Sequence, residues 1–144
     1  MEEIEWNNYR FQIERDRSEI TIWIIDPSMN HSQPVFDYKL KNLNGIESFI
    51  EGDYYQDGMN KETLVKVDEK KSYAALIHNF LLNNLERLPE IINIYSSPLF
   101  SKSSNVYMTP PTINFWCIQM NKKPDIPVFY IGELKRFKLQ LRNV

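Results

Sequence analysis

Apolar and polar residues alternate in three stretches of the amino-terminal part of the chain. Residues 9–14 alternate Tyr, Phe and Ile with Arg, Gln and Glu, and residues 20–24 repeat the pattern after a polar turn. Residues 36–41 alternate in the same way. Because side chains along a β-strand point to opposite faces in turn, this period of two predicts a β-hairpin followed by a third strand.

A helical period replaces the alternation in the middle of the chain. Apolar residues recur three or four positions apart from Tyr73 to Leu85, which is the spacing of one face of an α-helix. This pattern predicts a long amphipathic helix at about 70–88, which Pro89 ends. A shorter helix is predicted at 90–95.

The remaining segments are less regular. Residues 46–58 combine helical spacing with two glycines that break the pattern, and residues 96–111 are rich in Ser and Pro and predict a long loop. Further strands are predicted at residues 62–67, 113–120, 128–131 and 137–141, the second and third of them as central strands because they are apolar on both faces. Together these elements predict an α+β fold, with a mostly antiparallel sheet of about six strands and the long helix packed on one face. The length of 144 residues favours a single domain spanning residues 1–144.

Charge is distributed unevenly along the chain. Residues 1–69 contain 7 Lys and Arg against 15 Asp and Glu, whereas residues 70–144 contain 10 against 4. Separate acidic and basic surfaces would steer charged partners, although the two halves could also neutralise each other in the fold. The single cysteine excludes an internal disulfide, and no apolar run approaches the length that spans a bilayer. These features lead us to expect a cytoplasmic protein that does not associate with membranes.

Residues suited to catalysis are few. The two histidines, His31 and His78, lie far apart in the sequence and have no second ligand at metal-binding spacing, so neither a metal nor another cofactor is expected. The four glycines are scattered and form no phosphate-binding loop. Cys117 lies in an apolar run and is expected to be a buried, inert thiol. We therefore expect no catalytic residues, and the alternative is a small enzyme of unrecognised type that uses His78 or Cys117.

Basic residues near the carboxyl end suggest a third class of function. Lys122-Lys123, Lys135-Arg136, Lys138 and Arg142 could form a stripe beside an aromatic ring such as that of Tyr130. The acidic sequence pI of about 5.7 argues against a nucleic-acid-binding module, because such domains are usually basic. Because of this acidic pI, nucleic acid is an unlikely partner.

The segment from Glu47 to Asp57 combines acidic and aromatic residues. It contains four acids and no base, interleaved with aromatic rings. Such a segment suits a basic protein surface, because the charges steer the encounter and the rings supply contact area. A solvated acidic turn would have the same sequence. The residues predicted to bind a partner are Glu47, Glu51, Asp53, Tyr54, Tyr55 and Asp57, with Tyr107 of the long loop as a second contact.

In its general character the chain resembles the immunity proteins of bacterial toxin–immunity systems. Like them it is small, leans acidic and has no active-site motif. The resemblance implies a non-enzymatic inhibitor, an antitoxin that binds a cognate toxin domain with a basic surface, such as a nuclease, and neutralises it by occlusion. Phage-encoded inhibitors of host defence share the same character. No motif carries the resemblance, so it transfers no functional residue.

Overall fold

The computed structural model describes residues 1–17, 19–29, 34–41, 50–54, 73–99 and 110–143, and all structural statements below refer to these residues. The strands are β1 (Glu2–Trp6), β2 (Tyr9–Arg15), β3 (Glu19–Ile25), β4 (Phe36–Lys41), β5 (Ile50–Tyr54), β6 (Ile94–Tyr95), β7 (Val128–Ile131) and β8 (Arg136–Leu139). The helices are α2 (Tyr73–Asn83) and α3 (Pro110–Met120), with short 3₁₀ turns at Pro27–Met29 and Leu85–Arg87. The fold class is α+β, as predicted.

Five strands form an antiparallel meander in the order β1-β2-β3-β4-β5. The predicted hairpin and third strand are confirmed as β2, β3 and β4. The register aligns Ile13 with Ile22 and Ile22 with Tyr38, so apolar side chains from successive strands share one face of the sheet. This inner face is buried, because Ile13, Ile22 and Tyr38 are at most 1% exposed.

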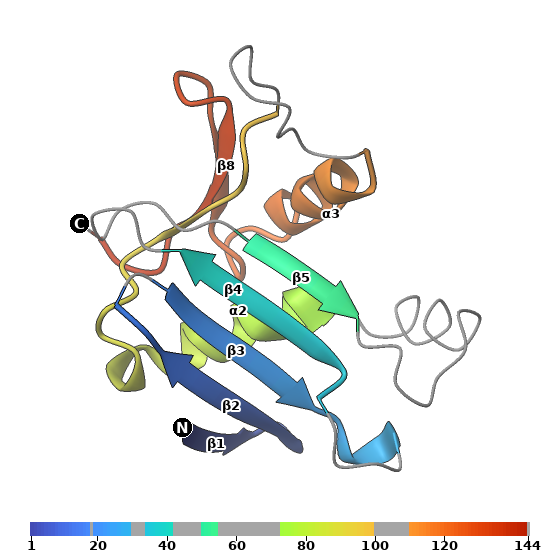
Figure 1. Cartoon of the computed structure of the whole chain (residues 1–144). Helices are drawn as coiled ribbons and strands as arrows, with labels where there is room; N and C mark the ends of the chain where they lie inside the picture. The colour runs from blue at the N-terminus through green and yellow to red at the C-terminus, as the bar shows by residue number, and fades with distance from the viewer. Residues whose placement is uncertain (18, 30–33, 42–49, 55–72, 100–109, 144) are drawn as a thin grey trace.

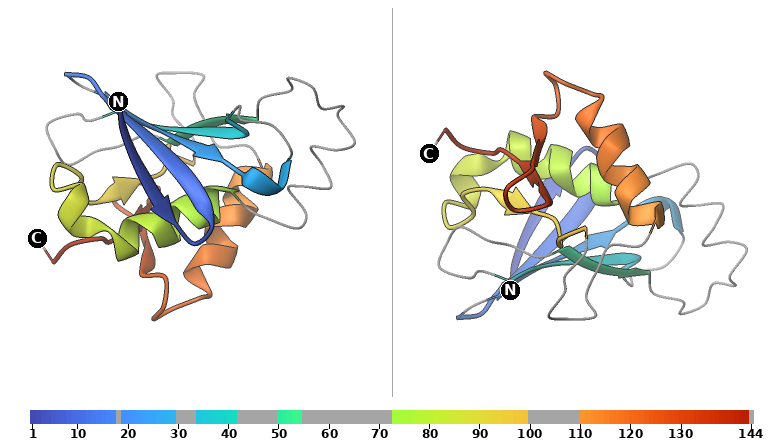
Figure 2. Two further views of the ribbon diagram at one scale, coloured as in Figure 1. Left: turned by 90° about the horizontal axis from the view of Figure 1, so that it is seen from below. Right: turned by 90° about the horizontal axis from the view of Figure 1, so that it is seen from above.

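Helix α2 covers the inner face of this sheet (Figures 1 and 2). Its buried residues include Tyr73, Ile77, Phe80 and Leu81, which recur with helical spacing. The rings of Phe80 and Phe11 stack at 4.0 Å between centroids, which joins the helix to β2. The predicted long helix therefore exists and packs where expected.

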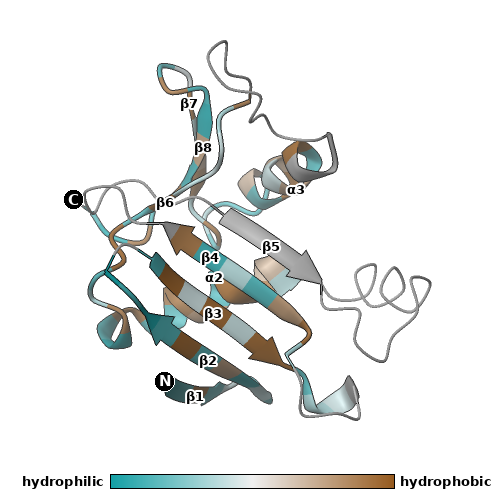
Figure 3. Cartoon of the chain, in the orientation of Figure 1, coloured by the Kyte–Doolittle hydropathy of each residue, from teal (hydrophilic) through white to brown (hydrophobic). Residues whose placement is uncertain are grey.

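The second layer of the molecule holds a three-stranded antiparallel sheet, in the order β6-β8-β7, together with α3. Both lie beyond α2, on the side away from the outer face of the five-stranded sheet (Figure 2). Trp116 of α3 stacks on Phe137 of β8 with ring centroids 6.0 Å apart, and both are buried in a core that is continuous with that of the large sheet. When residues are coloured by hydropathy, apolar and polar residues alternate along β3 and β4 (Figure 3).

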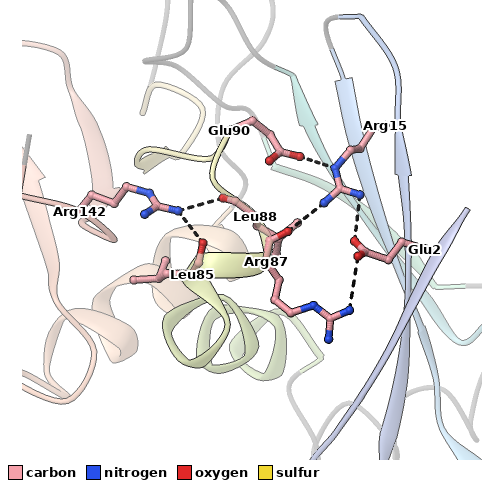
Figure 4. A network of polar contacts seen from close by, with 7 residues as sticks. All are labelled: Glu2, Arg15, Leu85, Arg87, Leu88, Glu90 and Arg142. Atoms are coloured by element: carbon pink, nitrogen blue, oxygen red, sulfur yellow. Dashed lines mark hydrogen bonds and ion pairs between the residues drawn. The ribbon is translucent and has the colours of Figure 1, made fainter.

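Arginine side chains tie the layers together (Figure 4). Arg15 of β2 bridges Glu2 and Glu90 and donates a further hydrogen bond of 3.0 Å to the carbonyl oxygen of Arg87. Hydrogen bonds and charge pairing with Glu90 and Glu2 raise the pKa of Arg15, and the Arg15 guanidinium lowers the pKa of Glu2. The sheet edge is thereby fixed to the turn that follows α2.

Arg142 closes the carboxyl end of the chain onto the same turn. Its Nη2 donates to the carbonyl oxygens of Leu85 at 2.7 Å and Leu88 at 3.0 Å, and its Nε donates to that of Ile91 at 2.9 Å. One guanidinium thus contacts three backbone carbonyls of the segment after α2, and those of Leu85 and Leu88 also accept backbone N–H groups.

The prediction of a strand at 113–120 is wrong, because these residues belong to α3. Two prolines, Pro110 and Pro111, open the helix, where a missing backbone N–H costs nothing. Trp116 and Gln119 are buried, whereas Asn114 and Ile118 are exposed, which is a helical distribution. The run is apolar on both faces only if its side chains are assumed to alternate between two faces, as they do in a strand.

Other predicted boundaries also need correction. Helix α2 ends at Asn83 instead of Leu88, since the amide groups of Asn83 and Asn84 turn back to backbone carbonyls four residues earlier. Residues 94–95 form β6, so the predicted helix at 90–95 is wrong. The chain has eight described strands in two sheets where about six in one were expected. β1 was not predicted, and β7 is an edge strand, not a central one.

Two further predictions concern segments that lie wholly or mostly outside the described residues. The strand predicted at 62–67 lies outside the described residues. Of the loop predicted at 96–111, residues 96–99 are irregular, residues 110–111 open α3, and the rest lies outside the described residues.

Candidate functional site

The outer face of the five-stranded sheet is the face turned away from α2. No described helix covers it (Figures 1 and 2). The register that places apolar residues on the inner face places the intervening residues here. Six of them are acidic or aromatic, and they lie on four neighbouring strands: Glu3, Glu5, Glu14, Glu19, Trp23 and Asp37, the last of which is buried. We call this surface the acidic sheet face.

A shallow groove of about 230 Å³ lies on the acidic sheet face. Three carboxylates line it, those of Glu14, Asp16 and Glu19, together with Thr21, Trp23 and Lys39. Glu14 and Asp16 are exposed, and Trp23 is half-buried. A half-exposed indole beside several carboxylates can bind a cationic side chain, because the ring face attracts the cation and the carboxylates accept its hydrogen bonds.

Strand β5 brings part of the predicted partner-binding segment to the edge of this sheet. The register pairs Glu51 with Lys39 and Asp53 with Asp37, and it pairs Tyr54 with Phe36. Glu51 and Asp53 therefore extend rows of the acidic sheet face, whereas Tyr54 extends the inner-face row of Phe36 and Ile24. The other four predicted residues, Glu47, Tyr55, Asp57 and Tyr107, lie outside the described residues.

Trp23 is the site residue that our sequence reasoning missed. The signal was present, because Trp23 lies between Ile22 and Ile24 in an alternating strand and so has to face away from the core. A large aromatic ring on the polar side of an amphipathic strand is a better indication of a contact surface than a cluster of loop acids, since it is exposed by the fold itself.

A second polar cluster lies at the centre of the molecule, where β4, α2 and α3 meet. The hydroxyl of Tyr38 and Nε2 of His78 are 2.7 Å apart, and both residues are fully buried. The rings of Phe115 and Trp116 lie 5.6 and 5.2 Å from the His78 ring. We call Tyr38, His78 and Gln119 the buried polar cluster.

Burial controls the protonation of this cluster. It lowers the pKa of His78 to about 4, because an imidazolium would lose its hydration, while the side chain of Gln119 acts in the opposite direction. Burial also raises the pKa of Tyr38 well above its ordinary value. Among the described residues, Nδ1 of His78 and Oε1 of Gln119 have no hydrogen-bond partner. A neutral Nδ1–H tautomer would turn a donor toward the unpaired oxygen and leave Nε2 to accept from Tyr38.

The buried polar cluster gives a substrate no access, since His78 is 0% exposed. Cys117 was predicted to be buried, but it is half-buried. It lies on α3, the helix that also contains Gln119. Asp26 accepts hydrogen bonds from Ser28 at 2.7 Å and from Tyr73 at 3.1 Å. In the described ranges no group of three or more His, Cys, Asp and Glu residues could hold a metal ion.

No protein-family model, curated protein sequence or solved structure matches the chain. Nor is any helix in the described part of the chain long and apolar enough to cross a membrane.

Proposed function

We propose that the chain is a non-enzymatic binding protein, an immunity protein that neutralises a cognate toxin by covering a basic surface of it with the acidic sheet face. The observation that carries this proposal is the groove beside Trp23, which combines an aromatic ring with three carboxylates and one lysine on the side of the sheet away from α2. Toxin domains that act on nucleic acid have basic active surfaces, and a nuclease is the toxin class we favour. We place this action in the cytoplasm.

The groove is suited to one anchoring arginine or lysine of the partner. The side chain would lie along the Trp23 ring and end between Glu14 and Glu19. Aromatic anchors at the centre of an interface commonly carry 2 kcal/mol or more of the binding free energy, while surrounding charges mainly raise the association rate. We assign Trp23 the first role and the glutamates the second.

Strand β5 would widen the contact toward the segment predicted from sequence. By register, Glu51 and Asp53 continue the rows of Lys39 and Asp37 at the open edge of the sheet. An interface of ordinary size buries roughly 800 Å² on each partner, which is more than one groove provides. The acidic sheet face together with β5 is therefore our proposed contact surface.

The experiment begins with immobilised protein and a lysate of the cells that produce it. The variant Trp23→Ala removes the proposed anchor, and the double variant Glu14→Lys/Glu19→Lys reverses the charge of the groove. The matched control, Glu86→Lys/Glu133→Lys, makes the same change of charge at two exposed acids outside the acidic sheet face. Circular dichroism melting of each variant verifies that it is folded.

We expect the wild type and the control to retain one stoichiometric protein that the two groove variants lose. Affinity measurements with that protein should show Trp23→Ala binding roughly 30-fold more weakly, which corresponds to about 2 kcal/mol. Producing the captured protein alone should arrest bacterial growth, and co-producing the wild-type chain should restore it. Capture that is equal for all variants would reject the acidic sheet face, and a captured protein that is not toxic would reject the immunity function.

A further inference from the structure

The outer face of the three-stranded sheet alternates aromatic rings and ammonium groups. The register aligns Tyr95 with Lys138 and Lys138 with Phe129. One row across the sheet therefore contains an aromatic residue, a lysine and a second aromatic residue, in that order. Nζ of Lys138 lies 5.8 Å from the centroid of the Tyr95 ring, and Nζ of Lys123 lies 4.1 Å from that of Phe129. We call Tyr95, Lys123, Phe129 and Lys138 the basic hairpin face.

This part of the molecule also exposes unusually large apolar side chains. Apart from Met1, every large hydrophobic residue that is exposed among the described ones lies on α3 or on the hairpin of β7 and β8: Ile118, Phe129, Tyr130 and Leu134. Phe129 alone leaves 39% of its surface in water, next to the exposed Lys123. The exposed ring of Phe129 next to a cation is available for contact with a partner.

The three-stranded sheet lies on the far side of α2 from the five-stranded sheet (Figure 2). The acidic sheet face and the basic hairpin face therefore belong to different sheets. An anionic ligand would complement the two lysines of the basic hairpin face.

We propose that the basic hairpin face binds single-stranded nucleic acid. Strand spacing in a sheet is about 4.8 Å, so rings and ammonium groups follow one another closely along the row, as bases and phosphates do along a nucleic acid strand. An unpaired base stacks on the Phe129 ring, and the flexible side chain of Lys123 moves from the ring to the adjoining phosphate. Lys138 contacts the next phosphate.

The position of Lys138 favours nucleic acid over an acidic protein. Interfaces between proteins concentrate apolar residues at the centre and leave charges at the rim. Here the ammonium group of Lys138 lies beside the exposed ring of Phe129 in the row, and the ring of Tyr95 on its other side is buried. Sheet faces that bind single strands have this mixed arrangement, because each nucleotide presents both a π-face and a charge.

The test is fluorescence anisotropy of the intact protein with labelled oligothymidine and oligouridine of about 15 nucleotides, a length that covers a typical single-strand site. The variant Phe129→Ala removes the stacking ring, and its control Leu134→Ala removes an exposed apolar side chain of the adjoining turn. The variant Lys138→Glu reverses a charge of the face, and its control Arg17→Glu makes the same change at an exposed residue outside the basic hairpin face. A thermal melt of each variant tests its folding.

We expect both single strands to bind, more weakly as salt rises from about 50 to about 200 mM, and a duplex of equal length to bind less well. Phe129→Ala and Lys138→Glu should each weaken binding roughly ten-fold, and the two controls should leave it unchanged. The proposal is overturned if neither single strand binds at low salt, if the duplex binds as tightly, or if Phe129→Ala has no effect. Equal binding of poly-glutamate, or self-association of the protein that Lys138→Glu abolishes, would assign the face to a protein ligand instead. None of these outcomes bears on the toxin-binding proposal, which concerns the other face.

Discussion

The buried polar cluster makes the stability of this protein dependent on pH in a way that can be calculated. His78 has a pKa of about 4 in the folded chain and the ordinary value of 6.5 in the unfolded chain. Between these two values the unfolded chain binds a proton that the folded chain does not. Acid therefore favours unfolding: the contribution of neutral His78 is fully present above pH 6.5 and is lost as the pH falls toward 4.

The size of the effect follows from the same two values. Each pH unit between them changes the free energy of unfolding by about 1.4 kcal/mol, so the whole window is worth roughly 3 kcal/mol. Between neutral pH and about pH 4.5 the loss should be about 2.5 kcal/mol, a large share of the 5–15 kcal/mol that stabilises a typical domain. Tyr38 stays protonated throughout, because burial raises its pKa.

The assay compares urea unfolding of the wild type with that of the variant His78→Gln at both pH values. Glutamine retains a polar group opposite the Tyr38 hydroxyl but does not titrate. We expect the variant to be less stable at neutral pH by about 1–3 kcal/mol, since the hydrogen bond and the packing are imperfectly replaced. Acidification should then cost the wild type about 2.5 kcal/mol more than it costs the variant.

Subtracting the two pH dependences isolates the titration of His78. The carboxylates and the second histidine, His31, are common to both proteins and cancel in the difference. The fluorescence of Trp116, whose ring lies 5.2 Å from that of His78, reports the unfolding of this region. Parallel losses of stability in the two proteins, or an NMR titration of folded His78 near 6.5, would refute this account of the cluster.

Two further predictions concern the arginine contacts. Arg142→Lys keeps the charge but cannot reach three carbonyls at once, so we expect a loss of about 2 kcal/mol by chemical denaturation, whereas Lys135→Ala in an exposed turn should cost less than about 0.5 kcal/mol. Arg15→Met retains the apolar part of the side chain and removes the bridge to Glu2 and Glu90. It should cost about 1 kcal/mol at low salt and less at high salt, and a loss independent of salt would contradict an electrostatic origin.

Local patterns were sufficient to predict the three central strands of the large sheet, but not β1 or β5. The hairpin of β2 and β3 and the strand β4 alternate without interruption, and the period of two has one interpretation when it is this regular. The helix α2 followed equally from its spacing. β1 was missed because it is an edge strand with acids at three of its five positions. Charged residues on an edge strand discourage pairing with other chains, but the same composition is also typical of a solvated coil.

The features that escaped prediction depend on contacts between distant segments. α3 is short and nearly uniform in hydropathy, so only its two leading prolines distinguish it from a strand. His78 is completely buried, and its hydroxyl partner Tyr38 comes from β4, a strand distant in the sequence. The acidic sheet face was only partly anticipated, because recognising it requires knowing which side of the sheet the helix leaves open.

The order of strands in the small sheet has a consequence for synthesis of the chain. β8 follows β6 and β7 in the chain, yet it lies between them in the sheet, where they do not pair with each other. Arg142, which contacts the carbonyls at 85, 88 and 91, follows β8 in the chain. On the ribosome, the five-stranded meander can form early from neighbouring segments, whereas this second layer has to wait until residues 136–142 have emerged. Folding of the nascent chain should therefore proceed in two stages, with the layer that bears the basic hairpin face completed only after translation has passed residue 142.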